Sequence, residues 1–170
     1  MEKSKVNFMS SKRLQLLRAT VEEAELIWQM QVEAFADLLE KYQDMDTNPA
    51  NEPIEKVIKR LEQHYTYFYL LKWNEDIVGA IRVVDKKDNN INKRISPIFV
   101  LPKYRNMGFA QKAIYEVESI HGSDNWELDT ILQEEGNCYL YQKMGYRLTG
   151  KTQVINDKLT LVFMKKEKES

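Results

Sequence analysis

Residues 100–110, Val-Leu-Pro-Lys-Tyr-Arg-Asn-Met-Gly-Phe-Ala, decide the fold, because this basic turn joins an expected strand over 94–100 to an expected helix. After the turn, apolar residues recur at helical spacing: Ala110, Ala113, Ile114, Val117 and Ile120. Gly108 allows the backbone to approach a ligand closely, because it has no Cβ atom. The first N–H groups of a helix lack partners within it and carry partial positive charge. We therefore expect an anion site at this turn, with pyrophosphate as the usual guest.

Length and composition predict one domain over residues 1–170, with flexible ends at 1–11 and 165–170. The net charge of −1 gives no general attraction to nucleic acid or to an anionic membrane, so neither is an expected partner. The single cysteine, Cys138, excludes an internal disulfide and favours a cytoplasmic protein. Met1–Lys12 lacks the apolar segment of a secretory signal, and no apolar run reaches the roughly 18 residues of a membrane span.

Hydrophobic periodicity predicts an α/β fold with the order β-α-α-β-β-β-α-β-α-β-β, and hence a mixed sheet with helices on both faces. Thr20 and Glu23 have the spacing of a capping box at the start of the first helix. Gly145, followed by Tyr146, predicts a Schellman ending for the last helix. The expected strands are 12–19, 65–73, 77–84, 94–100, 126–131, 147–155 and 159–164. The expected helices are 20–42, 54–61, 110–120 and 138–144.

Pro97 is unusual because it falls in the middle of the expected strand 94–100. A proline there removes a donor from the hydrogen-bond ladder, so it belongs on an edge strand or at a bulge. Both alternatives stay open from the sequence. A bulge would part this strand from one of its neighbours.

Two motifs together resemble those of a known family. The turn lacks the Gly-Lys-Ser/Thr ending of a P-loop and the three glycines of a dinucleotide fingerprint. Its pattern, Arg105-x-x-Gly108-x-Ala110 after Val100-x-Pro102-x-Tyr104, resembles the acyl-CoA motif of the GCN5-related N-acetyltransferases. The later stretch 137–146 resembles that family's second signature, a tyrosine-bearing helix followed by Lys-x-Gly-aromatic. One helix and one strand separate the motifs, as in the family, and the resemblance covers residues 13–163.

The resemblance implies the GNAT-like acyl-CoA N-acyltransferase fold and the transfer of an acetyl group from acetyl-CoA to an amine. The acceptor would be a primary amine of a small molecule or peptide, which attacks the thioester directly. Backbone N–H groups of the turn would hold the pyrophosphate, and the preceding strand would bind the pantetheine arm as a further strand would. The implied cofactor-binding residues are Ile98, Phe99, Val100, Arg105, Asn106, Met107, Gly108, Phe109, Ala110 and Asn137.

Tyr141 matches the tyrosine that would protonate the leaving thiolate, although a core aromatic on an amphipathic helix is the alternative. Tyr139 lies about 200° away round the helix and is expected to pack. Asn137 would bond the amide groups of the cofactor, or would cap its helix instead. For a general base the candidates are Asp129, Glu134 and Glu33, with none preferred, and a water chain that ends in bulk solvent is the alternative.

Several functional questions stay open. His64 and His121 have no partners at metal-ligand spacing, so no metal is expected. Acidic residues between 33 and 52 indicate either an entrance for a cationic amine or a charged surface. The C-terminal hairpin offers a free strand edge for a homodimer. A non-catalytic acyl-CoA-binding sensor or interaction module on the same fold is the alternative to an enzyme.

Overall fold

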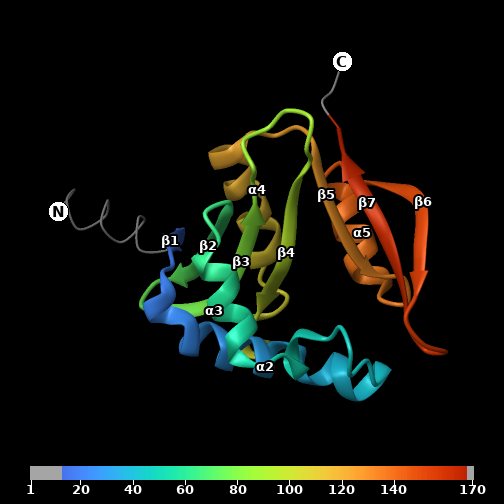
Figure 1. Ribbon diagram of the computed structural model, residues 1–170, viewed down its shortest axis with the longest axis horizontal. Coiled ribbons are helices and arrows are strands. Elements are labelled where there is room, and N and C mark those ends of the chain that lie inside the picture. The colour runs from blue at the N-terminus through green and yellow to red at the C-terminus, as the bar shows by residue number, and fades with distance from the viewer. Residues whose placement is uncertain (1–12, 168–170) are drawn as a thin grey trace.

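Within residues 13–167, the strands pair into one seven-stranded sheet in the order β1-β2-β3-β4-β5-β7-β6 (Figure 1). The computed structural model describes residues 13–167. The strands are β1 (Leu14–Arg18), β2 (Thr66–Trp73), β3 (Asp76–Val84), β4 (Lys93–Val100), β5 (Trp126–Ile131), β6 (Arg147–Val154) and β7 (Thr160–Lys166). The helices are α2 (Ala24–Tyr42), α3 (Ile54–Glu62), α4 (Phe109–His121) and α5 (Glu135–Lys143), with short 3-10 turns η1 (Val21–Glu23), η2 (Pro49–Asn51) and η3 (Pro102–Tyr104). The expected mixed sheet and element order are confirmed.

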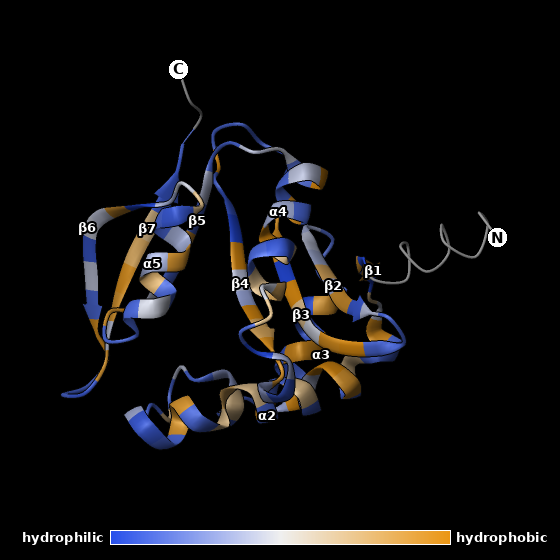
Figure 2. Ribbon diagram, turned by 180° about the vertical axis from the view of Figure 1, so that it is seen from behind, coloured by the Kyte–Doolittle hydropathy of each residue, from blue (hydrophilic) through white to orange (hydrophobic). Residues whose placement is uncertain are grey.

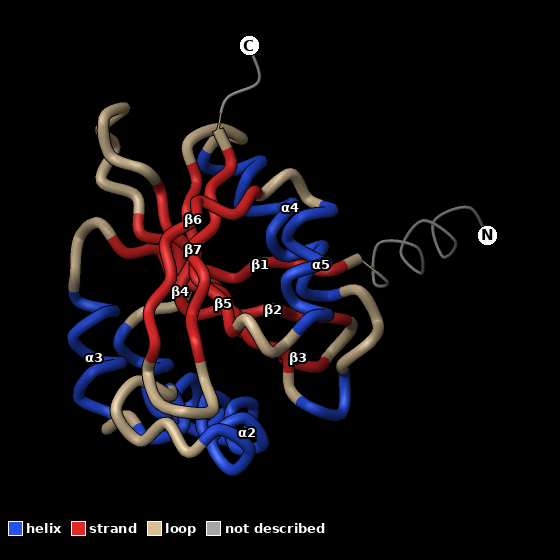
Figure 3. Tube along the Cα trace, turned by 90° about the vertical axis from the view of Figure 1, so that its right-hand side faces the viewer, coloured by secondary structure: helices blue, strands red, loops and turns tan. Residues whose placement is uncertain are grey.

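Helices α2 and α3 lie on one side of the sheet, and α4 and α5 lie on the other (Figure 3). Each side has its own apolar core, and apolar residues dominate the strands of the first half of the sheet, whereas the connecting loops are hydrophilic (Figure 2). The core beneath α2 and α3 includes Ile27, Val57 and Phe68. The core beneath α4 includes Ile81, Ile114 and Trp126. Burying each such side chain contributes about 1.5–3 kcal/mol to folding.

The C-terminal part of the sheet is covered differently. Helix α5 packs on one face of β5, β7 and β6, and no helix among residues 13–167 covers their other face, which is turned toward the viewer in Figure 1. We call this uncovered surface the open face; its side chains include Glu127, Asp129, Phe163, Lys165 and Lys151. Every residue of β6 is exposed.

The sheet parts between β4 and β5. Their parallel ladder contains two pairs, Lys93 with Trp126 and Arg94 with Glu127, after which the strands diverge. Beyond Arg94, the polar backbone groups of β4 that point toward β5 therefore have no ladder partner. This free stretch of strand lies inside the molecule rather than at the outer edge of the sheet.

A bulge in β4 coincides with this divergence. The register with β3 shifts between Ile81 and Val83, so that Ser96 and Pro97 together face Arg82. The Ser96–Pro97 peptide bond is cis, and the Arg82 guanidinium donates to the Ser96 carbonyl oxygen at 2.7 Å. Of the two alternatives for Pro97, the bulge is the one observed, because β4 lies between β3 and β5 in the sheet order.

Helix ends follow the sequence in most places. Thr20 and Glu23 form the predicted capping box, although the first turn is 3-10 before α2 begins. Helix α5 begins three residues earlier than expected, because the Glu134 carbonyl already accepts the N–H groups of Asn137 (3.1 Å) and Cys138 (3.3 Å). Within residues 13–167, none of the helices is both long and apolar enough to span a bilayer.

The predicted flexible end at 165–170 is wrong for its first two residues. Strand β7 continues to Lys166, whose ammonium group lies 2.5 Å from a Glu118 carboxylate oxygen on α4. This ion pair connects the end of β7 to α4. Residue 167 is exposed beyond the strand, and the other expected flexible residues, 1–11 and 168–170, lie outside the described part of the chain.

Candidate active site

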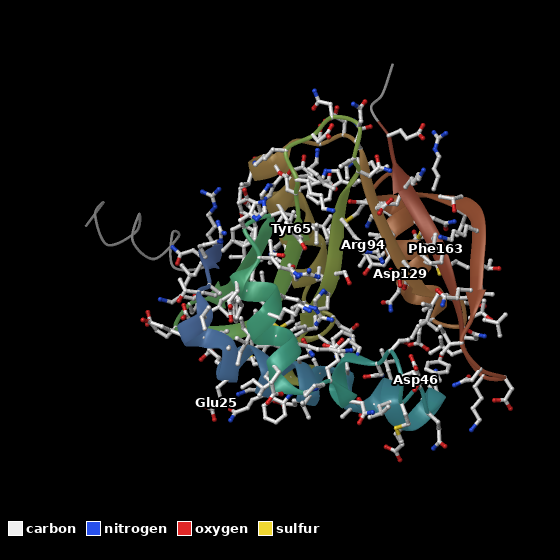
Figure 4. The ribbon with its side chains drawn as sticks, viewed as in Figure 1. Glu25, Asp46, Tyr65, Arg94, Asp129 and Phe163 are labelled. Carbon is white, nitrogen blue, oxygen red and sulfur yellow. The ribbon has the colours of Figure 1, made fainter. Side chains whose placement is uncertain are left out.

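The divergence of β4 and β5 creates a cavity of about 230 Å³, which we call the splay cavity. Residues 95–98 of β4 and 128–131 of β5 form its walls. Helix α2 and the segment around η2 close one end, and α5 contributes Asn137 and Tyr141. Figure 4 shows Arg94 and Asp129 next to each other at the gap between the two strands.

The Gly108 turn lies at the end of β4. Asn106 and Gly108 both adopt left-handed backbone conformations, with φ of 64° and 81°. Gly108 occupies the N-cap position of α4 and offers no side-chain acceptor, so within residues 13–167 no side-chain cap binds the first N–H groups of the helix. A Cβ added at Gly108 would have no heavy atom within 4 Å, so the space beside this turn is open to a ligand. The geometry has the features of an anion site.

Arg105 was expected to help bind the pyrophosphate, but its polar groups bind other parts of the protein. Its backbone N–H donates to the Pro102 carbonyl oxygen at 3.3 Å within the 3-10 turn. Its guanidinium donates to the Ala34 carbonyl oxygen at 2.5 Å and lies 3.4 Å from the Asp37 carboxylate. Arg105 therefore ties the turn to α2, which leaves the N–H groups of the following residues for an anion.

The strand residues expected to bind pantetheine lie beyond the bulge. On one side Ile98, Phe99 and Val100 pair with β3, and on the β5 side they have no strand partner. Ile98 lines the splay cavity. The side chain of Phe99 is buried on the α2 side, with its ring centroid 5.8 Å from that of Phe35.

Tyr141 lines the splay cavity from α5. Burial and the nearby Asp129 carboxylate raise the pKa of Tyr141 to about 12, so that its hydroxyl stays protonated at neutral pH. A protonated phenol facing a cavity can donate a proton to a reacting group.

The predicted Schellman ending fixes this tyrosine. The Tyr146 N–H donates to the Tyr141 carbonyl oxygen at 3.0 Å, and the Gly145 N–H donates to the Gln142 carbonyl oxygen at 3.0 Å. Gly145 has the positive φ, 98°, that this motif requires. The rings of Tyr141 and Tyr146 then meet with centroids 6.2 Å apart, which is the apolar contact that accompanies such an ending.

The neighbours of Tyr141 were predicted less well. Tyr139 is 69% exposed, so the expectation that it packs is wrong. Asn137 is the third residue of α5 and lines the splay cavity, whereas Glu134 holds the N-cap position. The capping alternative for Asn137 is therefore wrong, and its contact with the cofactor stays a prediction.

The three candidate bases are now distinguished. Asp129 lines the splay cavity, whereas Glu33 is exposed on α2. Glu134 accepts hydrogen bonds from the Tyr42 hydroxyl and from the Lys41 ammonium group at 2.9 Å. These bonds lower the pKa of Glu134 and tie the end of α2 to the loop before α5. Of these three candidates, Asp129 is the carboxylate that lines the cavity.

The acidic residues between 33 and 52 are not grouped as an entrance for a cationic amine. Asp37 faces Arg105, and the buried Asp44 accepts the N–H groups of Asp46 (3.2 Å) and Thr47 (2.9 Å). Glu52 pairs through both oxygens with the Arg60 guanidinium, at 2.7 and 2.8 Å. Three of the six carboxylates thus serve the fold, which favours the charged-surface alternative.

Arg94 is a site residue that sequence reasoning missed. Its guanidinium binds the Asp129 carboxylate and lies 3.7 Å from that of Glu127, so it joins β4 to β5 where they part. The opposite charges of Arg94 and Asp129 could have indicated this contact only if the parallel register of β4 and β5 had been known. Among residues 13–167, no group of three or more His, Cys, Asp or Glu side chains gathers to hold a metal ion.

A mixed sheet that parts in this way, beside an uncapped helix start, is the architecture of an acyl-CoA N-acyltransferase. A profile of the family described as "Acetyltransferase (GNAT) domain" matches residues 32–168. The chain therefore belongs to the GNAT acetyltransferase family, as its two motifs predict. It is an acetyl-CoA-dependent acetyltransferase, with acetyl-CoA as cosubstrate. Comparison with curated proteins gives no match.

Solved structures share this fold at low sequence identity. The ribosomal-protein-S18-alanine N-acetyltransferase of Escherichia coli aligns with a TM-score of 0.70 and 9% identity, over 89% of this chain and 92% of that one. Spermidine N-acetyltransferase of Vibrio cholerae, in complex with CoA and spermine, aligns with a TM-score of 0.68 and 12% identity, over 89% and 93%. An acetyltransferase from Thermus thermophilus aligns with a TM-score of 0.65 and 14% identity, over 89% and 94%.

Proposed function

We propose that the protein transfers the acetyl group of acetyl-CoA directly to an amine of a small molecule or peptide, within the splay cavity. The observation that carries this proposal is the convergence of three features on one cavity: a free length of β4, a protonated tyrosine and a carboxylate. A cofactor arm lying between β4 and β5 would bring its thioester among these groups.

The cofactor would be held by backbone groups. The N–H groups of residues 106–110 would bind the pyrophosphate, since the start of α4 has no side-chain cap. The pantetheine arm would then bond to the unpaired side of residues 98–100, as an added strand bonds to a sheet edge. Asn137, facing the same cavity, would bond an amide group of that arm.

In the proposed reaction, Tyr141 and Asp129 would each transfer one proton. The neutral amine attacks the thioester carbonyl carbon, and a backbone N–H of β4 would stabilise the oxyanion that forms. When the carbon–sulfur bond breaks, Tyr141 would give its proton to the departing thiolate. Asp129 would accept the proton that the amine nitrogen loses, directly or through water. The acetyl group ends on nitrogen, and free CoA is released.

Tyr141→Phe tests the catalytic part of this proposal. We expect turnover of amines to fall about 100-fold or more, the usual contribution of a positioned proton donor. Acetyl-CoA affinity should stay within about threefold of wild type, since Phe preserves the contact with Tyr146. Release of CoA from acetyl-CoA in the presence of a panel of amines measures turnover, and isothermal titration calorimetry measures binding.

The alternative function, a non-catalytic acyl-CoA sensor, predicts a different result. It would be supported if wild type binds acetyl-CoA tightly while no amine on the panel is acetylated. Equal turnover by wild type and Tyr141→Phe would leave transfer intact but remove Tyr141 from it. Tyr139→Phe is the matched control, because that tyrosine points to solvent from the same helix.

A further inference from the structure

A second cavity lies on the open face, beside the splay cavity, and we propose that it binds an anionic group carried by the acceptor amine. We call it the lysine groove; its volume is about 390 Å³. The proposal rests on the proposed function, since it describes the far end of the molecule whose amine would enter the splay cavity. Its ligand chemistry is a carboxylate or phosphate joined to a primary amine.

Among the charged side chains that line the lysine groove, the cationic ones outnumber the acidic one. Arg94, Lys151 and Lys165 contribute three positive charges, against the single carboxylate of Glu127. The other lining residues are Leu128, Thr149, Phe163 and Met164. A groove with this excess of positive charge attracts anions and repels polyamines.

The pairing of these charges leaves two lysines available. Arg94 is occupied by Asp129 and Glu127, and Glu127 is also 3.4 Å from the Asn92 side-chain amide. Neither Lys151 nor Lys165 forms an ion pair within 4.0 Å among the described residues 13–167. A bound carboxylate or phosphate would give them the partner that the protein does not supply.

One of the two lysines, Lys151, lies over an aromatic ring. The Lys151 ammonium group lies over the Phe163 ring, 4.5 Å from its centroid, and the Thr149 hydroxyl donates to the Phe163 carbonyl oxygen at 3.0 Å. The Phe163 ring therefore forms an apolar floor with a cation above it. Such a surface suits an acceptor with an apolar body and an anionic end.

The two cavities are adjacent, which links the groove to the reaction. Leu128 lines both, and Asp129 in the splay cavity binds Arg94 in the groove. Neighbouring strands lie about 4.8 Å apart, so the backbones at Lys165 on β7 and Lys151 on β6 are about 5 and about 10 Å from β5. An acceptor with its amine and its anion separated by a chain of about six carbons would span this distance.

Binding of matched amines to the CoA-saturated protein tests the proposal without requiring turnover. The probes are 6-aminohexanoate, 6-aminohexyl phosphate, hexylamine and 1,6-diaminohexane, followed by NMR titration. We expect at least one anionic probe to bind about tenfold more tightly than hexylamine, the factor that one charge-assisted hydrogen bond supplies. The tighter of the two anionic probes identifies the source as carboxylate or phosphate.

The double variant Lys151→Glu, Lys165→Glu should abolish this preference and favour the diamine. Its matched control is Lys56→Glu, Lys59→Glu, which makes the same change of net charge at exposed positions on α3. Equal affinity for all four probes would overturn the proposal, as would an equal effect of the two double variants. Selective binding of an anionic probe, with no amine acetylated when acetyl-CoA replaces CoA, would uphold the groove and instead contradict the proposed function.

Discussion

The first four strands of the sheet lie between helices on both faces, whereas β5, β7 and β6 carry a helix on one face. In β3, five of nine residues are buried, and in β6 all eight are exposed. The two halves are joined by the ladder pairs of Lys93 and Arg94, and the Arg94–Asp129 contact lies where they separate. The difference indicates that the enclosed half supplies most of the stability and that the other half offers the surface where an acceptor can approach.

The most direct test of this contrast is to replace one phenylalanine in each half with alanine. Phe68 on β2 is 1% exposed in the core beneath α2, and Phe68→Ala should lower the free energy of unfolding by about 3–5 kcal/mol. Phe163→Ala on the open face should cost about 1 kcal/mol, because its ring is only half-buried. Urea unfolding measures both. Equal losses would mean that the open face is covered in solution, for example by a second copy.

A pair of glycine substitutions separates the enclosed strands from the exposed helix. A Cβ at Gly79 on β3 would lie 2.1 Å from the Phe99 carbonyl oxygen, so Gly79→Ala must displace β4 and should cost about 1–3 kcal/mol. Gly136, in the first turn of α5, has open space around it, and Gly136→Ala should stabilise the protein by about 0.4–1 kcal/mol. Thermal unfolding would show opposite shifts, and a Gly79→Ala protein as stable as wild type would contradict the close approach of β3 and β4.

The enclosed half also contains a pH-sensitive contact. His121 is buried between the Tyr69 hydroxyl and the Asp85 carboxylate, each at 2.8 Å, with Lys87 and Lys93 nearby. Burial lowers the pKa of His121 despite the carboxylate, so the unfolded chain takes up a proton near pH 6.5 before the folded protein does. Stability should therefore be full above about pH 6.5 and fall below it, by at most about 1.4 kcal/mol per pH unit.

The variant His121→Gln isolates this titration. The difference in unfolding free energy between wild type and variant should shrink as the pH is lowered from 7.5 to 5.5. A difference that grows toward acid would show that the imidazole is charged in the folded state, bound as an ion pair to Asp85.

The smallest effect is expected at the turn. Arg105→Ala should lower stability by about 1 kcal/mol, because it removes the contacts with Ala34 and Asp37. Acetyl-CoA affinity should change less than about threefold, since the guanidinium is turned to α2. A loss of affinity above about tenfold with unchanged stability would instead assign Arg105 to the phosphates. Lys103→Ala, in the same turn, is the control.

Local features were predictable from the sequence because they depend on residues close together in the chain. The capping box at Thr20 and the Schellman ending at Gly145 each need only a few neighbouring residues. The Gly108 turn was found for the same reason. Periodicity also placed the strands, since the apolar face of each is set by its own residues.

Contacts between distant segments were not predictable. Arg94 meets Asp129 across 35 positions, and Tyr42 meets Glu134 across 92. The direction of the Arg105 side chain depends on where α2 crosses the sheet, which no local pattern reveals. The end of β7 at Lys166 depends likewise on Glu118 of α4. In each case a charged side chain has many solvent-facing alternatives, and tertiary packing chooses among them.

The unpaired length of β4 has a further consequence for self-association. An exposed strand edge invites pairing with other chains, and proteins usually protect such edges. This edge faces inward, and α2 closes the opening by contacts with both sides. Arg105 binds the middle of α2 at Ala34. At the end of α2, Lys41 and Tyr42 bind Glu134, and the Asn156 side chain donates to the Tyr42 carbonyl oxygen at 3.0 Å. The unpaired edge of β4 is therefore accessible to a narrow ligand and is shielded from pairing with a strand of another protein.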